Sequence, residues 1–156
     1  MSNQKEKARR FVRLHEGPGA FLITNAWDAG SARVLAELGF EALATSSGAA
    51  AGTLGQRDGT MTRAQAMASA HAIAAATDLP VSADLEHGFA DEPQGVAQTI
   101  RLAAAAGLVG ASIEDATGNV EKPIFELDRA VQRVRAAVRA AREQPFEFTL
   151  MARSEN

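Results

Sequence analysis

Four acidic residues stand where their side chains could gather around one cation. Asp84 and Glu114 end two apolar segments typical of buried strands, Glu86 follows shortly after Asp84, and Asp58 lies in a long glycine-rich loop. Clustered carboxylates raise one another's pKa unless a cation neutralises them. With no cysteine and no paired histidine spacing, this all-oxygen set favours Mg²⁺ or Mn²⁺ over zinc, with one carboxylate in direct contact sufficing for Mg²⁺. Helix N-caps or solvated loop acids fit the spacing equally well.

A second group of residues could bind a carboxylate substrate. Ser46, Ser47 and Gly48 begin the glycine-rich loop, and their hydroxyl and N–H groups are candidate donors. Arg153 ends the last apolar segment, where a guanidinium could hold a carboxylate in bidentate fashion. Ordinary turn hydrogen bonds and an ion pair are the competing interpretations. The loop matches neither GxGxxG nor GxxxxGK[ST], so it lacks the parts of a nucleotide site.

Two further features carry less chemistry. His87 follows Glu86 and is a weak candidate for a base. The arginines of residues 129–143, including Arg133, Arg135 and Arg139, are expected to form a solvated helix face, as the acidic composition suggests.

The composition is that of one folded unit, with 156 residues of which 46% are hydrophobic and 22% charged. The formal net charge of -3 gives no reason to expect binding to nucleic acid or anionic lipid. The absence of cysteine excludes disulfides and a cysteine nucleophile, and it fits a cytoplasmic protein. The longest apolar stretch, residues 102–111, has about half the length that spans a bilayer, and we expect neither a membrane segment nor an export signal.

The elements that would position these residues alternate along the chain. Strands are expected at residues 21–25, 41–47, 79–84, 109–115 and 148–156, and helices at residues 7–16, 29–38, 63–77, 94–107 and 129–143. Asp28 is a candidate N-cap, and Thr62 with Gln65 has capping-box spacing. Residues 48–60 are expected to be a loop. Short apolar strands between helices indicate a parallel sheet covered by helices.

Such a sheet could be an open doubly wound sheet or part of a (β/α)8 barrel. Length favours the open sheet, because a complete barrel needs about 250 residues. Polar residues follow every strand in the manner of both folds. The last strand has no covering helix, so residues 1–156 are expected to form a single partial domain.

Five ordered segments resemble the isocitrate lyase/phosphoenolpyruvate mutase superfamily, most closely its short single-domain bacterial members. These segments are NAWDAGSARVLAELGF, TSSGAAAGTLGQRDG, PVSADLEHGF, GASIEDATG and LMARSEN, and they cover most of the chain from Phe21 onward. The resemblance implies a (β/α)8 barrel, of which about five of eight βα units are present here. It also implies a homo-oligomer, a small 2-oxo or 2-hydroxy acid substrate, and cleavage of carbon-carbon or carbon-phosphorus bonds through an enolate with Mg²⁺.

The resemblance also implies roles for individual residues. Asp84 would bind the metal directly, and Asp58, Glu86 and Glu114 would hold metal-bound waters. Hydroxyl and backbone donors of Ser46, Ser47 and Gly48 would bind the substrate carboxylate. Arg153 would also bind the substrate. The chain departs from the family pattern at Glu86, where many members carry Asp, and in residues 116–128, which lack the cysteine used by the lyases as their acid/base. An isocitrate or methylisocitrate lyase is therefore disfavoured.

Three functions remain open. The first is Mg²⁺-dependent cleavage of a carbon-carbon bond in an oxaloacetate-like 2-oxo acid, for example decarboxylation, which needs no cysteine. The second is phosphonopyruvate hydrolysis or rearrangement. The third is a truncated, non-catalytic piece of such an enzyme, whose open strand edges would favour assembly with other chains.

Overall fold

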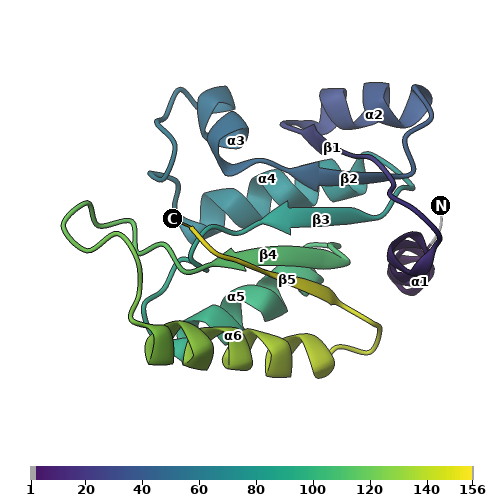
Figure 1. Ribbon diagram of the computed structural model, residues 1–156. Helices are drawn as coiled ribbons and strands as arrows, with labels where there is room; N and C mark the ends of the chain where they lie inside the picture. Colours follow the sequence, from purple (N-terminus) through teal and green to yellow (C-terminus); the bar gives the residue numbers. More distant parts are fainter. Residues whose placement is uncertain (1–2, 156) are drawn as a thin grey trace.

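The computed structural model describes residues 3–155, whose centre is a parallel sheet (Figure 1). Its strands follow one another in space in their chain order: β1 (Ile23–Ala26), β2 (Ala42–Thr45), β3 (Val81–Asp84), β4 (Gly110–Glu114) and β5 (Thr149–Arg153). The helices are α1 (Gln4–Glu16), α2 (Ala29–Glu37), α3 (Ser47–Thr53), α4 (Arg63–Ala75), α5 (Pro93–Ala105) and α6 (Leu127–Arg142). The predicted alternation of strands and helices is confirmed.

The main core lies between the sheet and the helices α2, α4, α5 and α6, and small side chains dominate it. Alanines of these helices pack on Leu43, Val81 and Ile113 of the strands. Since alanine adds little bulk, α5 and α6 lie close together beneath β4 and β5 (Figure 1). The strands are therefore held at fixed positions, and their final residues meet at one end of the sheet.

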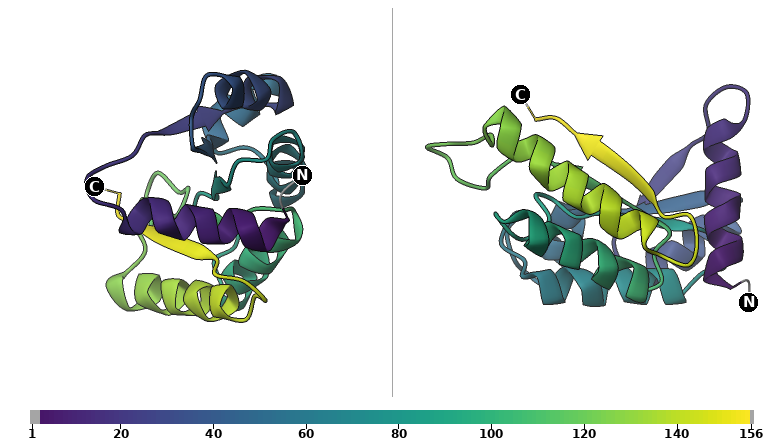
Figure 2. Two further views of the ribbon diagram at one scale, coloured as in Figure 1. Left: turned by 90° about the vertical axis from the view of Figure 1, so that its right-hand side faces the viewer. Right: turned by 90° about the horizontal axis from the view of Figure 1, so that it is seen from below.

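Helix α1 lies across the opposite end of the sheet, where the strands begin (Figure 2). Phe11 is fully buried there against Gly110, where a Cβ would lie only 2.9 Å from its ring. Lys7 Nζ donates to the carbonyls of Ala74 and Thr77 at the end of α4, at 3.3 and 2.6 Å. A cation at a helix C-terminus satisfies unpaired carbonyls and opposes the helix dipole.

Local hydrogen bonds explain why α2 and α4 begin where the sequence predicts. Asp28 and Thr62 are N-caps, each in a capping box, with Ser31 and Gln65 as the respective partners. The prediction of a loop over residues 48–60 is wrong in part, because the short helix α3 occupies its first residues. Ser46 caps this helix by accepting a hydrogen bond from Ala49 N–H. No helix within residues 3–155 is long and apolar enough to cross a membrane.

The prediction of a fully solvated arginine face on α6 is wrong for one residue. Arg133 is among the most buried side chains in the described chain, with 1% exposure, whereas Arg135 and Arg139 are exposed. The reason is its place on the helix, since Arg133 shares its face with the buried Ala136, Ala137 and Ala140.

Candidate functional site

A cavity of about 650 Å³ opens where the strands end, and it contains most of the chemistry that the sequence predicted. The predicted site residues that line it come from β3, β4, β5, the start of α3 and two loops: Ser47, Asp58, Asp84, Glu86, Glu114 and Arg153. The other two predicted residues, Ser46 and Gly48, lie beside it at the start of α3. Residues far apart along the chain are thus brought together because parallel strands end at one edge.

Asp84 is the most firmly held carboxylate of the cavity. Its Oδ2 accepts hydrogen bonds from the hydroxyl and N–H of Ser47, at 2.8 and 3.2 Å, and its Oδ1 accepts from Glu86 N–H at 3.2 Å. The Asp84 N–H donates to Thr45 Oγ1 at 3.0 Å. A carboxylate offers about four lone-pair sites, two on each oxygen, so Oδ1 keeps capacity for a further ligand.

Glu86 is held in an unusual position. Its backbone has a φ of 50°, the left-handed region that side chains other than glycine rarely adopt. Its Oε1 atom is buried and has no hydrogen-bond partner among the described residues. Burial, followed by the negative charges of Asp84, Asp58 and Glu114, raises the pKa of Glu86 from 4.5 to about 7. Among residues 3–155, no positively charged side chain is a cause of this shift.

Glu114 and Arg153 lie opposite each other in adjacent strands. They are register partners, and Arg153 Nη1 is 3.7 Å from Glu114 Oε2. Burial and the charge of Asp84 raise the pKa of Glu114, while Arg153 acts in the opposite direction. Arg153 also pairs with Glu155 and keeps more than half of its side chain exposed at the cavity. Arg153 thus forms ion pairs, as the competing interpretation expects, and still exposes part of its side chain to the cavity.

Asp58 reaches the site from the loop after α3. Its carboxyl lies against Gly48, where a Cβ would be 3.1 Å from the Asp58 Cγ and Oδ2 atoms. Ser46 Oγ accepts from Ala49 N–H at 3.3 Å, and the Ser47 donors are engaged by Asp84. Substrate binding by these two serines stays a prediction.

The donor set fits a hard cation held largely through water. Carboxylate oxygens, the unpartnered Glu86 Oε1 and the mutual repulsion of the acids all favour a divalent cation at this cavity. Within residues 3–155, however, no three His, Asp or Glu side chains form a group that could hold a metal ion. A site with three direct protein ligands is therefore not formed, and one or two carboxylates with bound waters fit better.

Two loops add residues that sequence reasoning underrated. The β4–α6 loop, closed by the antiparallel bridge between Ala116 and Ile124, projects beyond the strand ends (Figure 1). Ala116, Gly118, Pro123 and Ile124 of this loop line the cavity. His87 also lines the cavity, and burial together with the charge of Arg133 lowers its pKa. The signal for His87 was its place directly after Glu86.

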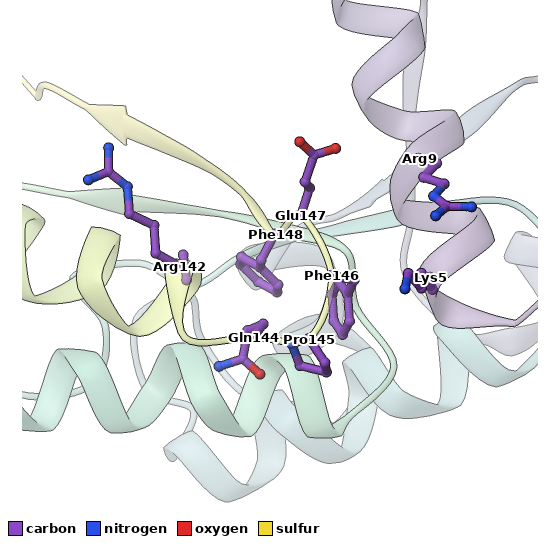
Figure 3. Close-up of a pocket in the computed structure, with 9 residues that line it drawn as sticks. Lys5, Arg9, Arg142, Gln144, Pro145, Phe146, Glu147 and Phe148 are labelled. Atoms are coloured by element: carbon purple, nitrogen blue, oxygen red, sulfur yellow. The ribbon is translucent and has the colours of Figure 1, made fainter.

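A different cavity, of about 560 Å³, lies at the other end of the strands (Figure 3). It is lined by Lys5 and Arg9 of α1, Arg142 at the end of α6, and Phe146 and Phe148 before β5. It contains a single carboxylate, that of Glu147, and none of the predicted site residues. The acid cluster therefore distinguishes the first cavity as the candidate site.

Comparison with known proteins gives matches along almost the whole chain. The family model described as phosphoenolpyruvate phosphomutase matches residues 11–156. A protein of Corynebacterium glutamicum described as a probable 2-methylisocitrate lyase is 32% identical over 88% of this chain. The chain spans 44% of that relative, and less than half the length of each curated relative it matches.

Solved structures share the fold closely. A candidate lyase/mutase from Burkholderia cenocepacia J2315 is 56% identical with a TM-score of 0.97, and the match covers 98% of this chain and 55% of that one. Oxaloacetate acetylhydrolase in complex with oxalate is 27% identical with a TM-score of 0.89, over 99% of this chain and 55% of that chain. These likenesses confirm the predicted α/β fold of barrel type. The described residues contain five consecutive strands of such a barrel.

Proposed function

The chain belongs to the phosphoenolpyruvate phosphomutase family, within the isocitrate lyase/phosphoenolpyruvate mutase superfamily, and from this premise we propose a function. The protein is a Mg²⁺-dependent lyase that cleaves a carbon-carbon bond in a small 2-oxo or 2-hydroxy acid such as oxaloacetate. The observation that carries the proposal is the acid cluster around Asp84 at the strand ends. The solved oxaloacetate acetylhydrolase, which acts on such an acid, supports the substrate class.

The contacts of Asp84 and the resemblance to the family together support a part for each residue. Asp84, fixed by Ser47 and the Glu86 N–H, is the candidate direct ligand, while Asp58, Glu86 and Glu114 would hold bound waters. When bound, Mg²⁺ supplies Lewis-acid stabilisation of the negative charge that develops on the 2-oxo oxygen. Arg153, exposed at the same cavity, provides a guanidinium for a substrate carboxylate.

The test measures the rate at which the protein with Mg²⁺ releases pyruvate from oxaloacetate. This rate is compared with the rate of the same reaction with Mg²⁺ alone. We expect Asp84→Ala to reduce the rate to that of the free ion, because it removes the most firmly held oxygen ligand. Asp128→Asn, at an exposed position on α6 outside the cavity, is the control and should retain the wild-type rate. A rate unchanged by Asp84→Ala contradicts the proposed role of Asp84.

A second function, carbon-phosphorus chemistry on phosphonopyruvate, is supported by the family description that the chain matches. Assaying oxaloacetate and phosphonopyruvate side by side separates the two, since a phosphonate replaces the leaving carboxylate. Binding of Mg²⁺ without turnover of either acid would instead support the non-catalytic alternative for this chain.

A further inference from the structure

Arg133 is a buried cation whose hydrogen bonds within residues 3–155 go to backbone carbonyls and not to a carboxylate. It lies in the middle of α6 with 1% of its surface exposed, and burial lowers its pKa. Removing a guanidinium from water is costly unless its donors are satisfied. Its Nε has no hydrogen-bond partner among the described residues, so the groups that its Nη1 and Nη2 bind indicate what the residue does.

The guanidinium donates to the backbone of the β3–α5 loop, which carries the acid cluster's Glu86. Its Nη1 donates to the carbonyls of Ala90 and Asp91, at 2.5 and 2.7 Å, and its Nη2 donates to the carbonyl of His87. The ring of Phe125, in the β4–α6 loop, lies 3.9 Å from the guanidinium carbon. One side chain thus contacts both loops that line the candidate site.

The β3–α5 loop needs external support because its backbone is strained. Glu86, Gly88 and Phe89 have φ values of 50°, 78° and 54°, in the left-handed region that residues other than glycine rarely adopt. Neighbouring elements hold the loop's carbonyls: Thr99 Oγ1 donates to Gly88 at 2.6 Å, and Glu114 N–H donates to Glu86 at 3.0 Å.

We propose that Arg133 is a positioning residue that fixes residues 86–91 so that Glu86 faces the cavity, and that joins this loop to the β4–α6 loop through Phe125. The proposal rests on the proposed function only in assigning a metal-related role to Glu86. Loop fixation itself follows from the three carbonyl contacts and the burial.

An arginine is required by the shape of this contact. The planar guanidinium spreads its donors over carbonyls at both ends of the turn, whereas a lysine ammonium is a single point with fewer, clustered donors. Arg133→Lys therefore keeps the positive charge but leaves part of the loop unheld. Arg139→Lys, at an exposed position on the same helix, is the matched control.

The test combines amide hydrogen exchange with Mn²⁺ titration on the same proteins. For Arg133→Lys we expect exchange in residues 86–91 to accelerate at least about tenfold, with β2 amides changing much less, and Mn²⁺ to bind about 10–100-fold more weakly. Arg139→Lys should match wild type in both measurements. A general loss of structure would accelerate β2 and the loop alike.

Equal exchange in residues 86–91 of wild type and Arg133→Lys overturns the inference, whatever happens to the metal. If wild type binds no Mn²⁺, the metal part of the proposed function fails, and loop exchange alone decides the role of Arg133. If Arg133→Lys does not fold, Phe125→Leu takes its place in the test. Phe125 is partly exposed, and its substitution removes the ring that packs on the Arg133 guanidinium. Faster exchange in residues 86–91 of that variant supports the inference, and unchanged exchange overturns it.

Discussion

Glu86 should destabilise the metal-free protein at alkaline pH. Its pKa is raised from 4.5 to about 7 in the folded chain, by burial first and then by the neighbouring acids. A carboxyl whose folded pKa exceeds its unfolded value favours folding below the unfolded pKa, and that contribution is lost as pH rises through the folded pKa. The stability loss from Glu86 should therefore develop between about pH 4.5 and pH 7 and be complete at pH 8.

The size of the effect follows from the shift. A change from 4.5 to about 7 corresponds to about 3 kcal/mol between the two protonation states. Because Glu86 is only partly buried, solvent screening reduces this to about 1–2 kcal/mol. Linkage leaves roughly a quarter of the effect at pH 5. Glu86→Gln, which keeps the shape but cannot ionise, should thus be more stable than wild type at pH 8 and nearly equal at pH 5.

Urea unfolding of metal-free protein at both pH values measures the difference. Glu37→Gln, at an exposed position on α2, is the control and should show no pH-dependent difference from wild type. The reasoning is refuted if Glu86→Gln differs from wild type by the same free energy at pH 5 and pH 8. Added Mg²⁺ at pH 8 should stabilise wild type more than Glu86→Gln, because a ligand stabilises the state that binds it.

Three glycine substitutions test the geometry around the cavity. Gly48→Ala places a methyl group 3.1 Å from the Asp58 carboxyl, so Mn²⁺ titration should show about tenfold weaker binding with little change in urea unfolding; unchanged affinity would contradict the role of Asp58. Gly88→Ala combines a φ of 78° with a contact of 3.1 Å to Val96 Cγ1 and should lose about 2–3 kcal/mol in urea unfolding. Gly118→Ala, with a φ of 74° in open space, isolates backbone strain and should lose about 1 kcal/mol; equal losses would refute crowding at Gly88.

The sheet and the position of the acids could be predicted because each depends on local pattern. Short apolar strands separated by helices specify parallel pairing, and parallel strands end together, so Asp84 and Glu114 had to lie at one edge. Asp58 was harder, since its approach depends on α3, a helix of 7 residues rich in glycine and alanine. Such a segment has little periodicity, and Ser46 capping decides its conformation.

Arg133 could not be recognised from charge alone. Arginines on an amphipathic helix are usually solvated, and composition gave no reason to separate Arg133 from Arg139. Spacing offered the missing signal, because Arg133 stands at the i−3, i−4 and i−7 positions of Ala136, Ala137 and Ala140, which are all buried. What periodicity could not supply was the partner, since the carbonyls that the guanidinium binds lie more than 40 residues away in the chain.

Glu86 combines three unfavourable features, two of which, the unpartnered Oε1 and the raised pKa, arise from its burial. The left-handed backbone, the unpartnered Oε1 and the raised pKa each reduce stability, and a glycine or a neutral residue would relieve at least one of them. Neighbouring structure maintains the arrangement, since Arg133 and Thr99 hold the same loop from α6 and α5. Local rules of stability fail together mainly where a chain binds something that offsets the cost. At a cavity lined by Asp58, Asp84, Glu86 and Glu114 the ligand that we propose is a cation, so metal binding and loop rigidity should change together in Arg133→Lys.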